Sequence, residues 1–336
     1  APDEQRVFRA LGVFAGAFDV EAVAAVSELS VQDATDVLEV LFARSLVVPS
    51  SATNRFRLLE TLKAYAERAL VDAGERDSVR ALHCDHYRHL GRADTLLAAW
   101  ELDRCVALLP DVGNLLLAAD WLESNRRWED LAEHLFGLAF VSGDDAGVML
   151  ARLNRCRRRV THQHHIDDLC HAAIFSTMAL ADWNAYIDAT AELRKSPNPT
   201  TAAFGYLYLA LVTARHAPDD AHSLIDRFAE LAGEDPPGDH ADHQVFWRSM
   251  VEAMSGDLDT AADLAGRVVD RPVGRTSLGL NAQLIVGAAA WAHGDPAPFA
   301  AVADLLEAAY RDTGRLDPFY ENIVGFARCL ALLTSD

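Results

Sequence analysis

The sequence predicts a mainly α protein, in which a winged-helix domain with a small β-hairpin precedes an α-helical, tetratricopeptide-like repeat array. Three observations carry this prediction. Apolar residues recur at spacings of three and four from Val7 to Leu333, as they do on one face of a helix. A strand pattern with a turn stands out only at residues 46–58. Turns followed by a small residue recur at roughly the interval of a helical repeat. We place the two domains at residues 1–75 and 76–336.

Three short helices are expected to open the chain. Asp19 and Ser30 are residue types that cap helix N-termini, and Asp33 stands three residues after Ser30 as a capping-box analogue. The helices are predicted over Glu4–Val13, Val20–Ser27 and Val31–Arg44.

The hairpin and a fourth helix complete the predicted winged helix. Leu46-Val47-Val48 runs into the turn-rich residues 49–54, and a second β-prone run follows at Arg55–Leu58. A helix is expected over Leu59–Ala73, with Gly74 ending it. Three helices followed by a β-hairpin is the winged-helix arrangement.

The remainder is predicted to be helix after helix. Four alanines follow turns at similar positions, where the two helices of a repeat would cross closely: Ala132, Ala185, Ala221 and Ala261. Gly287 fits the facing small position in the last pair. The spacing is looser than the ~34 residues of a tetratricopeptide repeat. A plain α-helical bundle therefore remains an alternative for this region.

The charge balance argues against several classes of partner. The 336 residues hold 30 basic and 50 acidic side chains, a formal charge of −20. Residues 1–75 carry 12 acids against seven bases, and the third helix sets Asp33, Asp36 and Glu39 against Arg44. Phosphates repel such a surface, so the sequence predicts no direct DNA binding by this chain. No apolar run reaches the ~18 residues of a membrane span, and no secretory signal is visible, which together predict a cytoplasmic protein without membrane contact.

Several N-terminal segments resemble a known family. Phe8-Arg9-Ala10-Leu11-Gly12-Val13-Phe14-Ala15-Gly16-Ala17-Phe18-Asp19, Ala43-Arg44-Ser45-Leu46-Val47 and the run Arg55–Ala66 are similar to motifs of bacterial STAND-type regulators. These are signal-transduction ATPases that include LuxR-type and antibiotic-regulatory activators. The resemblance covers about residues 1–125 and includes Gly113–Trp121.

The resemblance implies a role in signalling. In that family an ATPase precedes the winged helix, and a repeat sensor follows it. This chain has no G-x-x-x-x-G-K-[ST] motif, so ATP is expected on a missing upstream domain and no cofactor on this chain. The expected partners are an ATPase domain in cis and an unknown effector bound by the repeats. The alternative is a stand-alone protein–protein interaction scaffold without a transcriptional role.

Two surfaces are candidates for contacts with partners. Five arginines fall within residues 152–159, and no acid lies between Ala146 and Ile166. Arg152, Arg155 and Arg159 share one helical face and form a candidate patch for an anion or acidic partner, although a solvated face paired with nearby carboxylates remains the alternative. A candidate partner groove is expected on the first helices of the two best repeats, from His243, Phe246, Met250, Asn281, Leu284 and Trp291.

Neither catalysis nor a metal centre is predicted. No G-x-S-x-G or H-E-x-x-H motif occurs, so we expect no enzyme. Three histidine-rich stretches lack metal-ligand spacing with a second element, and the sequence predicts no metal site. The first contains His83, Cys84, His86 and His89. The second contains His162, His164, His165 and His171 with Asp167, Asp168 and Cys170, and the third contains Asp239, His240, Asp242 and His243.

Overall fold

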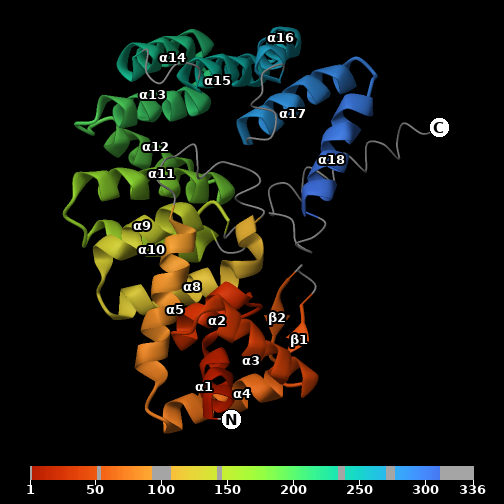
Figure 1. The fold of residues 1–336 in the computed structure, drawn as a ribbon. Helices are drawn as coiled ribbons and strands as arrows, with labels where there is room; N and C mark the ends of the chain where they lie inside the picture. Colours follow the sequence, from red (N-terminus) through yellow and green to blue (C-terminus); the bar gives the residue numbers. More distant parts are fainter. Residues whose placement is uncertain are drawn as a thin grey trace.

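The computed structural model describes residues 2–50, 54–92, 107–141, 146–233, 239–269 and 277–310. Within them the chain forms a winged helix at one end and a curved array of helices above it (Figure 1). The predicted mainly α class is confirmed, and the strands described form one two-stranded antiparallel sheet.

The winged helix closely follows the prediction. Its helices are α1 (Pro2–Ala10), a 3₁₀ turn η1 (Leu11–Val13), α2 (Val20–Ser27), α3 (Val31–Ala43) and α4 (Glu60–Asp72), and its strands are β1 (Val48–Pro49) and β2 (Phe56–Arg57). The first predicted helix is shorter than expected because its last turn tightens to 3₁₀ geometry. Gly74 takes φ +71°, which suits a residue without Cβ, and it ends α4 as predicted.

Both predicted caps are present. The Asp19 carboxylate accepts a hydrogen bond from the backbone N–H of Ala22 at 2.8 Å. The Ser30 hydroxyl accepts from the N–H of Asp33 at 3.1 Å and donates to its carboxylate at 2.6 Å. These bonds satisfy N–H groups that the first turn of a helix leaves unpaired.

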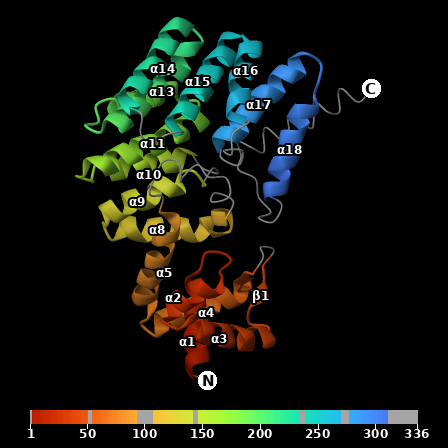
Figure 2. The ribbon, with the colours of Figure 1, turned by 45° about the horizontal axis from the view of Figure 1, so that its top comes forward.

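The array begins at α5 and rises as successive packed helices (Figure 2). The described elements are α5 (Arg76–Gly91), η2 (Leu109–Asp111), α8 (Val112–Ser124), α9 (Trp128–Leu138), α10 (Ala146–Arg157), α11 (Gln163–Ala179), α12 (Trp183–Leu193), α13 (Pro199–Ala214), α14 (Pro218–Ala232), α15 (Asp239–Ser255), α16 (Leu258–Val269), α17 (Ser277–Ala292) and α18 (Ala297–Tyr310). The array bends so that α17 and α18 lie on the same side of the molecule as the hairpin.

Small residues mark the close crossings, with one exception. Ala132, Ala221 and Ala261 are fully buried, as predicted. Ala185 is only half-buried, because the next residue, Tyr186, takes the inward position of α12. The register proposed for Ala185 is therefore one residue off. The tetratricopeptide assignment itself stays a prediction.

The buried core continues past the predicted domain boundary. One cluster of buried apolar side chains extends from Val7 in α1 to Ala173 in α11 and also includes Leu280 of α17 and buried residues of α18, and a second runs from Cys170 to Ile285. Phe14 stacks on Phe18 and also lies beside Tyr87 of α5, with ring centroids 4.6 and 6.3 Å away. A boundary at residue 75 stays a prediction. No helix in the described parts of the chain has the length and apolar character needed to cross a bilayer.

Candidate nucleic-acid interface and its junction with the array

The helix-turn-helix is formed by α2 and α3. The turn between them contains Glu28 at φ 54°, a left-handed conformation that redirects the chain at the end of the eight-residue α2. Ala34, Leu38 and Leu41 then face the core from α3. This packing leaves the opposite side of α3 open to solvent.

The outward face of α3 is acidic in the middle and apolar at its ends. Gln32, Asp36 and Glu39 are exposed, and the Gln32 amide donates to the Asp36 carboxylate at 2.9 Å. Val31 and Phe42 are about half exposed, at 50% and 49%. The face therefore offers an amide and apolar groups to a partner, together with its carboxylates.

The wing is a narrow ribbon fixed from both sides. β1 pairs with β2 in the register Val48↔Arg57 and Pro49↔Phe56. Phe18 forms a bridge to Phe56 on the other side, with backbone N–H···O distances of 2.9 and 2.8 Å. Arg57 is exposed on this ribbon and supplies a cation beside the helix-turn-helix.

A buried ion pair joins the wing to the array. Both terminal nitrogens of the Arg55 guanidinium donate to the carboxylate oxygens of Asp111, each at 2.6 Å, and a second acid, Asp19, lies 3.4 Å away. Asp111 is 1% exposed. Burial raises the pKa of Asp111, and the bonds from Arg55 oppose that shift. A bidentate guanidinium–carboxylate pair fixes both distance and orientation, so it sets the angle between the wing and η2.

Asn114 of α8 makes a second polar link. Its side-chain oxygen accepts from the N–H of Ala15 at 2.8 Å, and its amide donates to the carbonyl of Ala17 at 2.9 Å. His83 of α5 reaches the same oxygen at 3.4 Å. Burial lowers the pKa of His83 to about 4, so this ring is neutral at pH 7. The loop that leads into α2 is thus held by the array.

These linking residues were not predicted as a site. Arg55 and Asp111 stand 56 positions apart, and Asn114 is 99 positions from Ala15. No local spacing rule connects such residues, and in the sequence alone each has the pattern of an ordinary polar side chain at the surface.

The arginine patch has partners within the chain. Arg152 binds the carboxylates of Asp120 and Glu123 on α8, and Arg155 binds Glu123 at 2.7 Å. Hydrogen bonding from Arg155 lowers the pKa of Glu123. The guanidinium of Arg159 lies over the ring of Trp128, 5.9 Å from its centroid. The acids that relieve the repulsion among the arginines therefore come from a neighbouring helix. Binding of an external acidic partner stays a prediction, but Arg152 and Arg155 are not the unpaired charges on which that prediction was based.

The predicted groove residues do not lie together on one open surface. His243 and Phe246 are buried at 2% and 5% exposure, and His243 packs edge-on to Phe204 of α13 with centroids 5.6 Å apart. Met250, Asn281 and Leu284 are half-buried, and Trp291 is exposed. A role for these residues in binding a partner stays a prediction.

The comparisons with known proteins agree with the fold of the N-terminal part. Residues 1–71 match the model of the winged helix-turn-helix domain. The chain is 40% identical over 128 residues to proteins from Mycobacterium bovis and Mycobacterium tuberculosis whose names describe HTH-type transcriptional regulators. The matched stretch is 36% of this chain but 14% of each relative, so the chain spans a small part of their length. No solved structure matches the chain significantly.

These findings correct the prediction that this chain makes no direct contact with DNA. That prediction counted charges on the third helix and over residues 1–75. Counting is a poor guide here, because affinity depends on the few cations that reach phosphates. Several acids in the count are already engaged inside the fold: Asp33 by the Ser30 cap, Glu4 by Arg44 and Glu75 by Arg9. Arg57 is exposed on the wing, a position that a count of charges over residues 1–75 does not reveal.

Proposed function

We propose that this chain is the DNA-contacting and signal-receiving part of a transcription regulator. The winged helix-turn-helix match over residues 1–71 is the observation that carries the proposal. The regulators named among the relatives support it. In this proposal α3 enters the major groove with Gln32 toward base edges, and Arg57 of the wing contacts a phosphate.

The helical array acts as the sensor in this proposal. The Arg55–Asp111 pair and the Asn114 bonds connect α8 directly to the wing and to the loop before α2. A ligand or protein that shifts α8 would therefore move the two elements that a winged helix uses on DNA. This coupling supports a protein–protein or effector-sensing role for the array within the regulator.

The finer family role is also a proposal. The sequence resemblance to STAND-type regulators and the greater length of the relatives support an ATPase domain outside this chain, with ATP bound to that domain. In this proposal the regulator is cytoplasmic. In the full-length gene product, hydrogen exchange at residues 15–19 and 111–115 with and without ATP tests this coupling. A change in protection on adding ATP is expected, and identical protection would contradict the coupling.

DNA binding is tested on the chain itself. A random-sequence duplex pool is selected against the purified chain, and fluorescence anisotropy then measures the affinity for an enriched duplex at two salt concentrations. We expect Arg57→Glu to weaken binding about tenfold or more and to lower the salt slope by about one, as loss of a phosphate contact does. Gln32→Ala should instead reduce discrimination between the enriched duplex and a scrambled one.

A matched variant controls for charge. Arg248→Glu makes the same charge change on α15, far from the winged helix, and should leave DNA affinity unchanged. The proposal is overturned if no sequence is enriched, or if Arg57→Glu and Arg248→Glu change affinity equally.

A further inference from the structure

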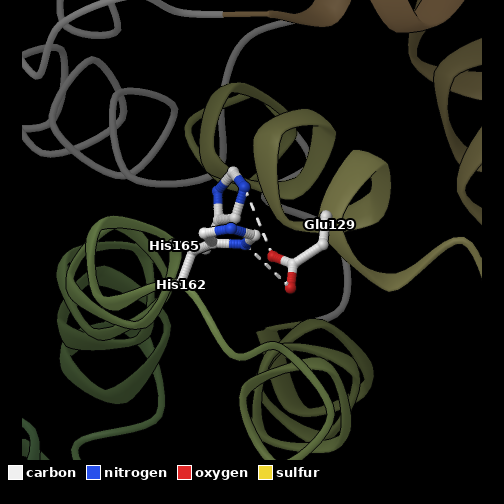
Figure 3. Close-up of side chains that lie close together, drawn as sticks. All are labelled: Glu129, His162 and His165. Carbon is white, nitrogen blue, oxygen red and sulfur yellow. Dashed lines mark ion pairs between the residues drawn. The ribbon is translucent and has the colours of Figure 1, made fainter.

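Three ligand-type side chains converge where the first turns of α9 and α11 meet (Figure 3). Glu129 lies in the first turn of α9, His162 is the N-cap residue of α11, and His165 is in the first turn of α11. We propose that Glu129, His162 and His165 bind a divalent metal ion of the zinc type.

The spacing of the donor atoms fits such an ion. Nδ1 of His162 is 3.2 Å from Oε1 of Glu129, and Nε2 of His165 is 3.3 Å from Oε2. One donor atom from each residue lies within 4.8 Å of the others. Bonds of about 2.0–2.1 Å around a tetrahedral ion place its ligands about 3.3–3.4 Å apart. Each imidazole nitrogen is thus about this far from one of the two carboxylate oxygens, and donors from all three residues lie within 4.8 Å of one another.

One ligand atom is buried without a hydrogen bond. Oε2 of Glu129 accepts none, although Nε2 of His165 is 3.3 Å away and the His165 side chain is only 5% exposed. A buried carboxylate oxygen left without a hydrogen bond costs free energy. An ion between Oε2 and the two imidazoles would supply the missing interaction.

Hydrogen bonds from Thr161 also orient the Glu129 carboxylate. The backbone N–H and the hydroxyl of Thr161 both donate to Oε1 of Glu129, at 3.0 and 3.1 Å. Bonds of this kind hold a metal-binding carboxylate in place. Because Thr161 immediately precedes His162, the same backbone segment positions the carboxylate and one imidazole.

The donor set favours zinc over the common oxygen-seeking ions. Two imidazole nitrogens and one carboxylate suit Zn²⁺, whereas Mg²⁺ and Ca²⁺ take oxygen ligands. Three protein ligands leave one tetrahedral position for water. The bound ion would clip the start of α9 to the start of α11, so that metal binding stabilises this part of the array. The competing interpretation is a pair of ordinary histidine–carboxylate contacts.

Calorimetric titration of Zn²⁺ alone into the chelator-treated full chain separates the two interpretations. We expect about one Zn²⁺ per chain, bound at micromolar concentration or tighter in the presence of millimolar Mg²⁺. His162→Gln and Glu129→Gln should each weaken binding at least tenfold. His162 is 64% exposed, so its replacement should leave the fold intact, which circular dichroism checks.

A distant histidine provides the control. His216 is exposed after α13, and His216→Gln should bind Zn²⁺ as the wild type does. Zn²⁺ should raise the thermal unfolding temperature by several degrees in the wild type and His216→Gln but not in His162→Gln. The proposal is overturned if binding is not saturable near one ion per chain, or if all variants bind Zn²⁺ equally.

Discussion

The contact between the winged helix and the array differs in kind from the contacts within the array. At the junction, Arg55, Asp111 and Asn114 form buried, directional bonds across chain segments that are 56 or more residues apart. Between the later helices the contacts are mostly apolar, and small residues such as Ala261 and Gly287 allow close approach. Directional bonds specify one orientation, whereas apolar packing specifies mainly volume. The two regions should therefore fail in different ways.

The largest expected effect is loss of the junction carboxylate. Asp111→Ala leaves the Arg55 guanidinium, whose side chain is 13% exposed, without its main partner. Breaking one side of a buried ion pair costs about 3–5 kcal/mol, and urea unfolding measures the loss. Hydrogen exchange should show the destabilisation in residues 2–92 and leave α13 and α14 protected.

The double variant Arg55→Met/Asp111→Leu serves as the control. It removes both charges and should recover most of the stability, because no charge is left buried. If Asp111→Ala and the double variant unfold alike, then an unpaired buried charge is not the cause of the loss of stability in Asp111→Ala.

Acid should weaken both regions through neutral buried histidines. Burial lowers the pKa of His83 and His134 to about 4, and that of His171 in α11 to about 3. The unfolded chain takes up these protons near pH 6.5 and the folded chain does not, so the stability is complete above about pH 6.5 and falls as pH drops toward 4. A shift of this size corresponds to about 3 kcal/mol for His83 at pH 4.

Urea unfolding at a series of pH values from 7 to 4 measures this slope. His171→Leu should reduce the dependence of the unfolding free energy on pH. This effect arises within the array, since the His171 ring lies 5.7 Å, centroid to centroid, from the rings of Phe204 and Tyr208. His216→Leu, at an exposed position, should leave the slope as it is in the wild type. Equal slopes in all three proteins would contradict the assignment.

Inside the array, volume should matter more than polarity. A Cβ added at Gly287 would lie 2.9 Å from the Cα of Phe299, so Gly287→Ala must push α17 and α18 apart. Overpacking of this kind costs about 1–3 kcal/mol. Thermal unfolding measures the loss.

Gly266 of α16 offers a matched substitution. No atom lies within 4 Å of a Cβ added there, so Gly266→Ala should stabilise the helix by about 0.5–1 kcal/mol. The packing interpretation fails if Gly287→Ala and Gly266→Ala shift the unfolding temperature in the same direction.

The smallest effect is expected at a surface ion pair of the array. Arg248 binds Asp226, whose side chain is 60% exposed. Arg248→Ala should cost less than about 1 kcal/mol, because water screens an exposed pair. A loss as large as that of Asp111→Ala would remove the distinction between the two regions.

Local patterns were enough to predict the winged helix and its caps. Ser30 and Asp19 cap helices through bonds to residues three positions away, and Gly74 ends α4 by its own backbone conformation. Such bonds are formed between near neighbours in the chain, so spacing alone reveals them. The succession of helices followed in the same way from apolar periodicity.

Tertiary structure decided which charged side chains stay unpaired at the surface and which side chains from distant parts of the chain come into contact. Composition pointed away from DNA, but packing pairs Arg44 with Glu4 and leaves Arg57 on the open wing. The arginines of α10 looked unpaired along the chain, and α8 supplies their acids. The carboxylate partner of His162 and His165 is no neighbour in the sequence, since α9 brings Glu129 beside them. Contacts of this kind depend on how helices pack, and packing is a sum over the whole core that no local spacing encodes.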